Sequence, residues 1–253
     1  MMTQEAILYY ADNPADFVED LLHVTPDKNQ RAILNSVAQN QMTSVRSGHG
    51  IGKSAVEAWT AIWFMSTRPF PKIPCTAPTQ HQLFDILWAE ISKWLRNNKA
   101  LERELVWTKE KVYMKQYPEE WFAVARTASK PDALQGFHAD DILYIIDEAS
   151  GVDDKVFEPV LGALSTPGAR LLMCGNPTQL SGFFMTVTTR TEAATPRSML
   201  TVGTAAASRT TSSRPSSRCT ARIRTFSEFV SPESSPGRRT MFSSLCHSSK
   251  NPL

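Results

Sequence analysis

The sequence has few cysteines, and they lie far apart. Only four occur in 253 residues, and no two have CxxC spacing. This excludes a disulfide scaffold and a compact zinc site, and it suits a reducing compartment. No apolar run approaches the roughly 20 residues that a membrane-spanning helix needs. The N-terminus also lacks a basic start followed by an apolar core. We therefore expect no secretory signal and no membrane partner, and we predict a cytoplasmic protein.

Several residue types are missing from the last 69 residues. Residues 185–253 contain no Trp, Tyr, Asp or Gln, only 10 Ile, Leu, Val and Phe, and 26 Ser and Thr. Residues 1–184 hold 17 Lys and Arg against 22 Asp and Glu, a net charge of −5, whereas residues 185–253 hold 10 against 3, a net of +7. So small an apolar fraction does not support a buried core. We predict a folded domain over residues 1–184 and a disordered, low-complexity basic tail over residues 185–253.

Strand and helix patterns alternate along the first 184 residues. Continuous apolar runs such as Ile142–Ile146 are typical of strands covered on both faces. The expected strands are Met42–Arg46, Ile73–Ala77, Val112–Gln116, Trp121–Thr127, Ile142–Ile146 and Arg170–Cys174, with helices from Thr25 to about Ala38, from Ser54 to Met65, and from Thr79 to about Arg96. This order predicts an α/β fold with a largely parallel central sheet flanked by helices. Its ligand sites should lie at the carboxyl ends of the strands.

The strongest motif is SGHGIGKS, which lies between an expected strand and an apolar helix. A phosphate-binding loop needs glycines so that backbone N–H groups can wrap the phosphates, a Lys for the β- and γ-phosphates, and a Ser or Thr for Mg²⁺. Lys53 and Ser54 match these roles, although Ser47 replaces the usual first Gly. A glycine-rich turn is the alternative. The predicted nucleotide-binding residues of this loop are Ser47, Gly48, His49, Gly50, Ile51, Gly52, Lys53 and Ser54.

The second motif is ILYIIDEAS, an apolar strand that ends in two acids. Asp147 is predicted to hold Mg²⁺ with Ser54, and Glu148 is predicted to activate the attacking water. Taken alone, the two acids fit the start of a loop or a helix cap about as well as they fit a catalytic role. With a phosphate loop upstream, the pair predicts a P-loop NTPase of the type that carries its own base (ASCE). The predicted cofactors are ATP and Mg²⁺.

Three further polar residues are weaker candidates. Asn176 follows an expected buried strand and is a candidate for contact with the γ-phosphate, although Gly-Asn-Pro is also an ordinary turn. Gln30 precedes the loop and carries an amide that can pair with an adenine edge, although a solvent-facing helical Gln is the default. Arg46 is either a cis arginine finger or a surface charge.

Together, these motifs resemble the ATPase domain of the tailed-bacteriophage terminase large subunit. The resemblance rests on TPDKNQRAIL, RSGHGIGKS, APTQHQL, DALQGFHADDILYIIDEASGV and LLMCGNPTQLSGFF, which span most of residues 20–184. It implies an ATP-driven motor that pulls double-stranded DNA through the portal into an empty capsid in the bacterial cytoplasm. The implied partners are double-stranded DNA, the portal protein, the small terminase subunit and further copies of the chain in a ring.

The resemblance also implies roles for individual residues. Gln30 would contact adenine, and residues 175–177 would couple hydrolysis to movement. Ser47 and His49 depart from the Arg-containing loops of some members, so the family's arginine finger stays unassigned, and Arg46 is the nearest candidate.

The segment after Phe184 does not match the family. Members carry a nuclease domain there with several metal-binding carboxylates, whereas residues 185–253 have no Asp and three Glu, so we expect no nuclease activity. Met185-Thr186 must be encoded ATG-ACN. If one T is inserted before these codons, the shifted frame reads TAT-GAC, which encodes Tyr-Asp, and an aromatic residue directly after SGFF suits the family. We therefore expect that a single-base frameshift after Phe184 produced the present segment. A genuine basic tail that binds DNA phosphates is the alternative.

Two other functions stay open. A helicase-like, DNA-stimulated ATPase shares the Asp-Glu pair after a buried strand. A non-catalytic remnant would bind nucleotide and show no DNA-stimulated hydrolysis.

Overall fold

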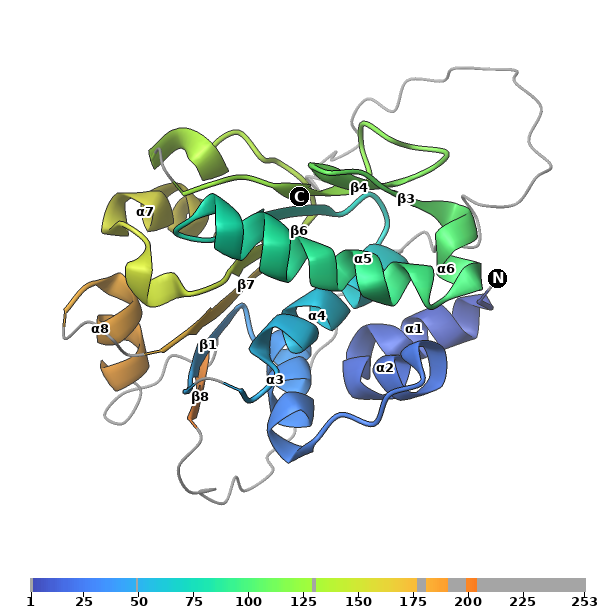
Figure 1. The fold of residues 1–253 in the computed structure, drawn as a ribbon, viewed down its shortest axis with the longest axis horizontal. Helices are drawn as coiled ribbons and strands as arrows, with labels where there is room; N and C mark the ends of the chain where they lie inside the picture. The colour runs from blue at the N-terminus through green and yellow to red at the C-terminus, as the bar shows by residue number, and fades with distance from the viewer. Residues whose placement is uncertain (1, 49, 129–130, 177–180, 191–198, 204–253) are drawn as a thin grey trace, which may run out of the picture.

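The computed structural model describes residues 2–48, 50–128, 131–176, 181–190 and 199–203 (Figure 1). Its helices are α1 (Gln4–Asp12), α2 (Pro14–Leu22), α3 (Lys28–Gln39), α4 (Lys53–Thr67), α5 (Ala89–Arg96), α6 (Lys99–Glu104), α7 (Asp154–Ala163) and α8 (Phe183–Arg190), with a π-helix at His81–Trp88 and 3₁₀ turns at Pro131–Leu134 and Ala149–Gly151. Its strands are β1 (Met42–Arg46), β2 (Lys72–Thr76), β3 (Leu105–Trp107), β4 (Lys111–Met114), β5 (Phe122–Ala125), β6 (Asp141–Ile146), β7 (Gly168–Gly175) and β8 (Met199–Gly203).

One eight-stranded sheet, in the order β3-β4-β5-β2-β6-β7-β1-β8, joins all the described strands. Neighbouring strands in the stretch β5-β2-β6-β7-β1-β8 pair in parallel, whereas β3 pairs with β4, and β4 with β5, in the antiparallel sense. Parallel strands end at the same edge of a sheet. Cys75 pairs with Ile145 and Val45 with Cys174, so the segments that follow β1, β2, β6 and β7 lie along one edge. The predicted α/β fold with a largely parallel central sheet is confirmed.

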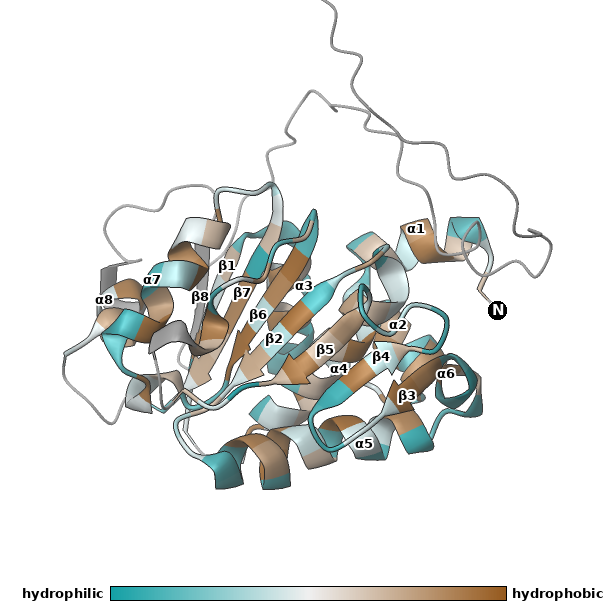
Figure 2. Cartoon of the chain, turned by 90° about the horizontal axis from the view of Figure 1, so that it is seen from above, coloured by the Kyte–Doolittle hydropathy of each residue, from teal (hydrophilic) through white to brown (hydrophobic). Residues whose placement is uncertain are grey.

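The sheet separates two hydrophobic cores. Side chains alternate between the faces of a strand, so Ile145 and Cys174 pack with α1 to α5, whereas Tyr144 and Met173 pack with α7 and Phe184. Figure 2 shows the strands between these two groups of helices. The larger core buries α4 almost entirely, which agrees with its apolar sequence. This packing fixes the first turn of α4 against the ends of the strands.

The helix expected from Thr79 to Arg96 has an unexpected winding. Residues His81–Trp88 form a π-helix and Ala89–Arg96 continue as an α-helix. A π-helix takes more residues per turn than an α-helix, so apolar positions that share an α-helical face no longer do so. Ile86, expected on the buried face, is 41% exposed, whereas Leu83 and Leu87 are buried.

Two described elements lie at or beyond the boundary predicted at residue 184, which stays a prediction. Helix α8 runs across it from Phe183 to Arg190, and β8 pairs in parallel with β1, Val202 opposite Val45. The start of α8 is held by Asp154, which accepts a 2.7 Å hydrogen bond from the Phe183 N–H. Both of these residues precede position 184. The rest of the predicted tail, residues 191–198 and 204–253, lies outside the described residues.

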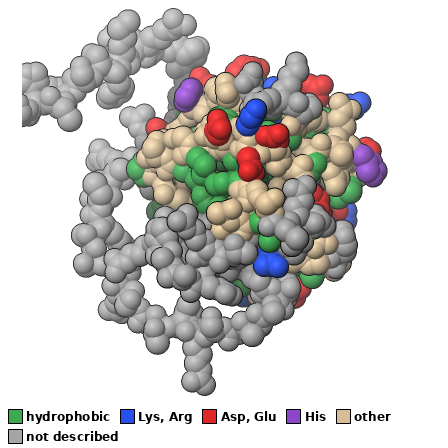
Figure 3. All heavy atoms as spheres, turned by 90° about the vertical axis from the view of Figure 1, so that its left-hand side faces the viewer, with side chains coloured by type: hydrophobic (Ala, Val, Ile, Leu, Met, Phe, Trp, Pro, Cys, Tyr) green, Lys and Arg blue, Asp and Glu red, His purple; other side chains and the backbone are tan. Residues whose placement is uncertain are grey.

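The side of the molecule that carries α7 and α8 has a mixed surface. Figure 3 shows a hydrophobic area among acidic side chains there, without a concentration of Lys and Arg on the visible part. Leu161 of α7 is 39% exposed. In the described part of the chain, no helix is both long and apolar enough to cross a membrane.

Candidate functional site

The loop between β1 and α4 has the backbone of a phosphate-binding loop. Gly50 and Gly52 adopt φ angles of +84° and +77°, a region that favours glycine. Because α4 begins at Lys53, its first N–H groups and the positive end of its dipole face the loop. Gly48 and Gly50 have open space where a Cβ would be, which leaves room for a ligand close to the backbone. Ile51 lies between the two positive-φ glycines, and His49 lies outside the described residues.

Lys53 is held inside the site rather than extended into solvent. Its side chain is 8% exposed, and Nζ donates a 3.2 Å hydrogen bond to the Gly48 carbonyl oxygen. Nζ also lies 3.8 Å from Oε1 of Glu148. The ammonium group therefore lies between the loop and the acid pair. Ser54, the next residue of α4, is half-buried.

Asp147 and Glu148 lie at the end of β6, beside the loop. Asp147 is 3% exposed, its N–H donates to the Thr76 carbonyl oxygen at 3.0 Å, and its Oδ1 accepts from the Glu148 N–H at 2.8 Å. Burial, followed by the charge of Glu148, raises the pKa of Asp147 to about 6. The carboxyl groups of Asp147 and Glu148 and the ammonium group of Lys53 are therefore close enough for their charges to interact.

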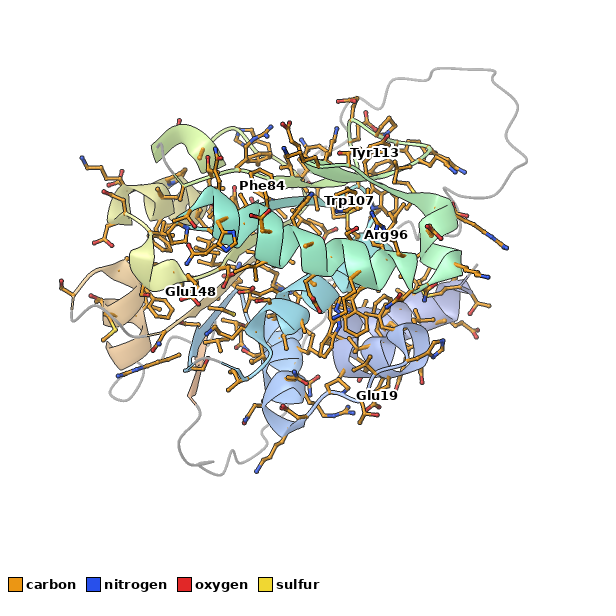
Figure 4. All side chains as sticks on the ribbon, in the orientation of Figure 1. Glu19, Phe84, Arg96, Trp107, Tyr113 and Glu148 are labelled. Atoms are coloured by element: carbon orange, nitrogen blue, oxygen red, sulfur yellow. The ribbon has the colours of Figure 1, made fainter. Side chains whose placement is uncertain are left out.

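Glu148 has a strained backbone. Its φ is +45°, in the left-handed region that non-glycine residues rarely adopt. Its N–H is bound to Asp147, and its carbonyl oxygen accepts from the Gly151 N–H at 2.9 Å. Glu148, labelled in Figure 4, lies on the loop between β6 and α7 and is 24% exposed. Strain of this kind clusters at functional sites.

The end of β7 contacts the loop between β1 and α4 directly. The Ser47 N–H donates to the Gly175 carbonyl oxygen at 3.2 Å, and the ring of Phe184 packs against Gly175. Asn176 follows at once, so the structure brings it to the same edge as Asp147. Pro177 of the predicted coupling motif lies outside the described residues, and Arg46 is exposed at the end of β1.

Gln30, predicted as either an adenine contact or a solvent-facing helical residue, has a structural contact that neither alternative included. Its Oε1 accepts from the Asp27 N–H at 3.0 Å, while Asp27 accepts from the Gln30 N–H at 2.9 Å, which is a capping box at the start of α3. Its Nε2 lies against Gly52, only 2.5 Å from where a Cβ would stand. The cap therefore fixes the amide beside the loop between β1 and α4.

The donor set at this edge suits Mg²⁺. Asp147 and Ser54 offer carboxylate and hydroxyl oxygens, the ligands that this hard cation takes together with substrate phosphates. Among the described residues, no three His, Cys, Asp or Glu side chains gather into a metal cage. Any Mg²⁺ here would complete its coordination with phosphate oxygens and water.

Sequence reasoning missed one buried acid near this site. Glu57 lies one turn after Lys53 on α4 and is fully buried. The signal was a single charged residue within the apolar run SAVEAWTAIWFM.

Comparisons with known proteins support the resemblance. No family model matches the chain. A protein of Enterobacteria phage P7 described as "Probable terminase, large subunit" is 34% identical over an alignment of 171 residues, and the match covers 63% of this chain. The match spans only 34% of that relative's length.

Two solved structures share the fold. The Thermus phage P74-26 large terminase ATPase domain has a TM-score of 0.57 at 22% identity, over 70% of this chain and 74% of that one. The large terminase of a thermophilic bacteriophage in complex with ADP has a TM-score of 0.54 at 15% identity, over 70% of this chain and 44% of that one. The chain therefore resembles the terminase large subunit in sequence and its ATPase domain in fold, as its motifs predicted.

The close approach of Gln30 to Gly52 leads to a first prediction. Gly52→Ala places a Cβ at φ +77° and 2.5 Å from Gln30 Nε2. A free loop that relaxes to relieve this backbone strain of about 1–2 kcal/mol would have to be restored when nucleotide binds, so we expect nucleotide affinity to fall about tenfold. The measurement is titration with a fluorescent ATP analogue. Gly162→Ala, in α7 with open space around it, is the control and should leave affinity unchanged. Equal affinities for the two variants would contradict the assigned loop geometry.

Proposed function

We propose that this chain contains the ATPase motor domain of a phage DNA-packaging terminase large subunit. It would hydrolyse ATP with Mg²⁺ and use the energy to move double-stranded DNA into a procapsid in the cytoplasm of the bacterial host. The observation that carries the proposal is the arrangement of Lys53, Asp147 and Glu148 at one sheet edge, beside a glycine loop that opens a helix. The P7 relative and the ADP-bound terminase of the thermophilic bacteriophage support it.

The proposed mechanism assigns one task to each part of the site. The loop N–H groups and Lys53 bind the β- and γ-phosphates. Lys53 then exchanges its contact with Glu148, now 3.8 Å away, for the γ-phosphate. This exchange frees the Glu148 carboxylate to orient water in line with the γ-phosphorus and accept its proton. Asp147 and Ser54 would hold Mg²⁺, which would supply neutralising charge to the phosphate oxygens.

Three other residues have supporting roles in the proposal. The Gln30 amide, which its capping box holds beside Gly52, is proposed to pair with the adenine edge. Asn176 contacts the γ-phosphate or the attacking water and signals its loss along β7. Arg46, exposed at the end of β1, is the proposed arginine finger. The proposed partners of the assembled motor are the portal protein, the small terminase subunit and further copies of this chain in a ring.

An ATPase assay with and without linear double-stranded DNA tests the proposal. We expect Mg²⁺-dependent phosphate release that DNA stimulates severalfold. Hydrolysis coupled to strand separation on a partial duplex would instead identify the helicase-like alternative, which shares the same Asp-Glu pair. Nucleotide binding without any hydrolysis would identify a non-catalytic remnant and overturn the motor assignment.

We also propose that residues 185–253 arose by a frameshift after Phe184. The support is compositional: this segment has 10 Lys and Arg, three Glu and no Asp, Trp or Tyr. Sequencing the gene tests the idea. The −1 frame beyond codon 184, which reads GAC from the last base of the Met185 codon, should encode an acidic, nuclease-like sequence, and its absence would favour a genuine basic tail.

A further inference from the structure

The turn that carries Glu148 has a backbone that depends on its surroundings. Glu148, labelled in Figure 4, has a φ of +45°, and such a conformation persists only where neighbouring structure holds it. Within the turn, the Glu148 carbonyl oxygen accepts from the Gly151 N–H at 2.9 Å, and the Ala149 carbonyl oxygen accepts from the Val152 N–H at 3.3 Å. These bonds shape the turn. Contacts with other segments decide where it lies.

Pro78, just after β2, packs against one side of this turn. A Cβ added to Gly151 would lie 3.0 Å from Cγ and 3.4 Å from Cβ of Pro78, and no other described heavy atom outside the chain neighbours lies within 4 Å of it. The φ of Gly151 is not in the left-handed region, so its backbone does not require glycine. The proline ring is therefore what leaves no room for a side chain at position 151.

The end of β7 packs against the other side of the turn. A Cβ added to Gly175 would lie 3.2 Å from the backbone nitrogen of Ser150. Strand β6, which leads into the turn, lies between β2 and β7 in the sheet. Ala149 is 1% exposed and Ser150 is 8% exposed. The turn is thus buried between the segments that follow the two neighbouring strands, and it has little room to move.

Taking the proposed function as its basis, we propose that Pro78 is a positioning residue of the ATPase site. By packing against Gly151, its ring holds residues 148–151 in the conformation from which Glu148 would orient the attacking water. A proline suits this task because its ring is rigid, and a glycine opposite lets that ring approach the backbone. The proposal gives a role to APTQHQL, a motif that the proposed mechanism does not use.

The first experiment alters the two sides of this contact separately. Gly151→Ala forces the turn and the proline ring apart, and we expect a kcat about tenfold lower, because a misplacement of 1 Å costs up to about 100-fold. Pro78→Ala removes the ring and loosens the turn, for which we expect a kcat about threefold lower. Affinity for a fluorescent ATP analogue should stay within about twofold of the parent in both variants, because the altered contact lies outside the loop between β1 and α4.

The double variant is the sharpest test of the contact. In Pro78→Ala/Gly151→Ala the nearest atom that remains is the Cβ at position 78, at the ordinary contact distance of 3.4 Å. The added methyl group then fills the space that the ring has left. We expect kcat to recover from the Gly151→Ala value to within about threefold of the parent, so the two losses should be strongly non-additive. Gly162→Ala, in α7 with open space around it, is the control and should behave as the parent does.

The second experiment asks whether the contact acts through Glu148. The same substitutions are placed in a Glu148→Gln background, and the residual rate is followed by single-turnover phosphate release. There, Gly151→Ala and Pro78→Ala should each change the rate by less than about twofold, because the group that they position is already disabled. If Gly151→Ala does not fold, Pro78→Ala in the two backgrounds and the double variant still decide the question.

Three outcomes would overturn the proposal. Parent-like kcat in both single variants shows that the contact positions nothing. Additive losses in the double variant show that Pro78 and Gly151 act separately. An equal loss with and without the Glu148 carboxylate shows that the effect does not pass through Glu148. In each case the parent still hydrolyses ATP, so the proposed function stands. If the parent itself hydrolyses no ATP, the proposed function fails and this inference fails with it.

Discussion

Glu148→Gln should abolish ATP turnover and leave nucleotide binding intact. Glutamine has the same shape as glutamate but cannot accept the proton of the attacking water. Because a general base contributes about 10²- to 10⁴-fold, we expect kcat to fall about 1,000-fold. The substitution also removes the charge that lies 3.8 Å from Lys53 Nζ. With that competitor gone, Lys53 is freer to bind phosphate, so affinity for ATP should stay the same or rise.

The measurement combines steady-state phosphate release with titration of a fluorescent ATP analogue. Glu158→Gln, at an exposed position of α7, is the matched control and should behave as the parent does. Parent-like turnover in Glu148→Gln would remove Glu148 from the reaction. Loss of binding together with turnover would instead indicate a structural role at its strained φ of +45°.

The local parts of this site could be predicted from the sequence because short segments encode them. The strand Met42–Arg46, the glycines after it and the apolar helix beyond are contiguous, and the structure reproduces them in that order. The acid pair after Ile142–Ile146 follows the same logic. Parallel pairing then brings the strand ends together, which the alternation of strands and helices also predicts.

What the sequence could not predict depends on contacts between distant segments. The burial of Glu57 depends on α4 entering the larger hydrophobic core, which includes residues as distant as Leu172 and Cys174. The placement of Gln30 Nε2 against Gly52 depends on α3 packing beside the loop. The strand Leu105–Trp107 was missed because three residues are too short for a period-two pattern to be recognised. The π-helix at His81–Trp88 was missed because its apolar residues are spaced as in an α-helix.

Lys53→Ala should abolish nucleotide binding itself, in contrast to Glu148→Gln. The structure places its ammonium group between the loop and the acid pair, where the side chain is 8% exposed and bound to the Gly48 carbonyl oxygen. Its removal deletes charge-assisted hydrogen bonds to phosphate, each worth about 1.5–3 kcal/mol. Two such bonds amount to a loss of about 100-fold or more in affinity.

A second effect adds to this loss. Without Lys53, the carboxyl groups of Asp147 and Glu148 lose the positive charge that lies beside them, and they repel the negative triphosphate. Isothermal titration with ATP and Mg²⁺ measures the result, and Lys155→Ala, at an exposed position of α7, is the control. Binding of ATP by Lys53→Ala within twofold of the parent would mean that this loop does not hold the phosphates. Loss of binding here, together with retained binding in Glu148→Gln, would separate phosphate recognition from the chemical step.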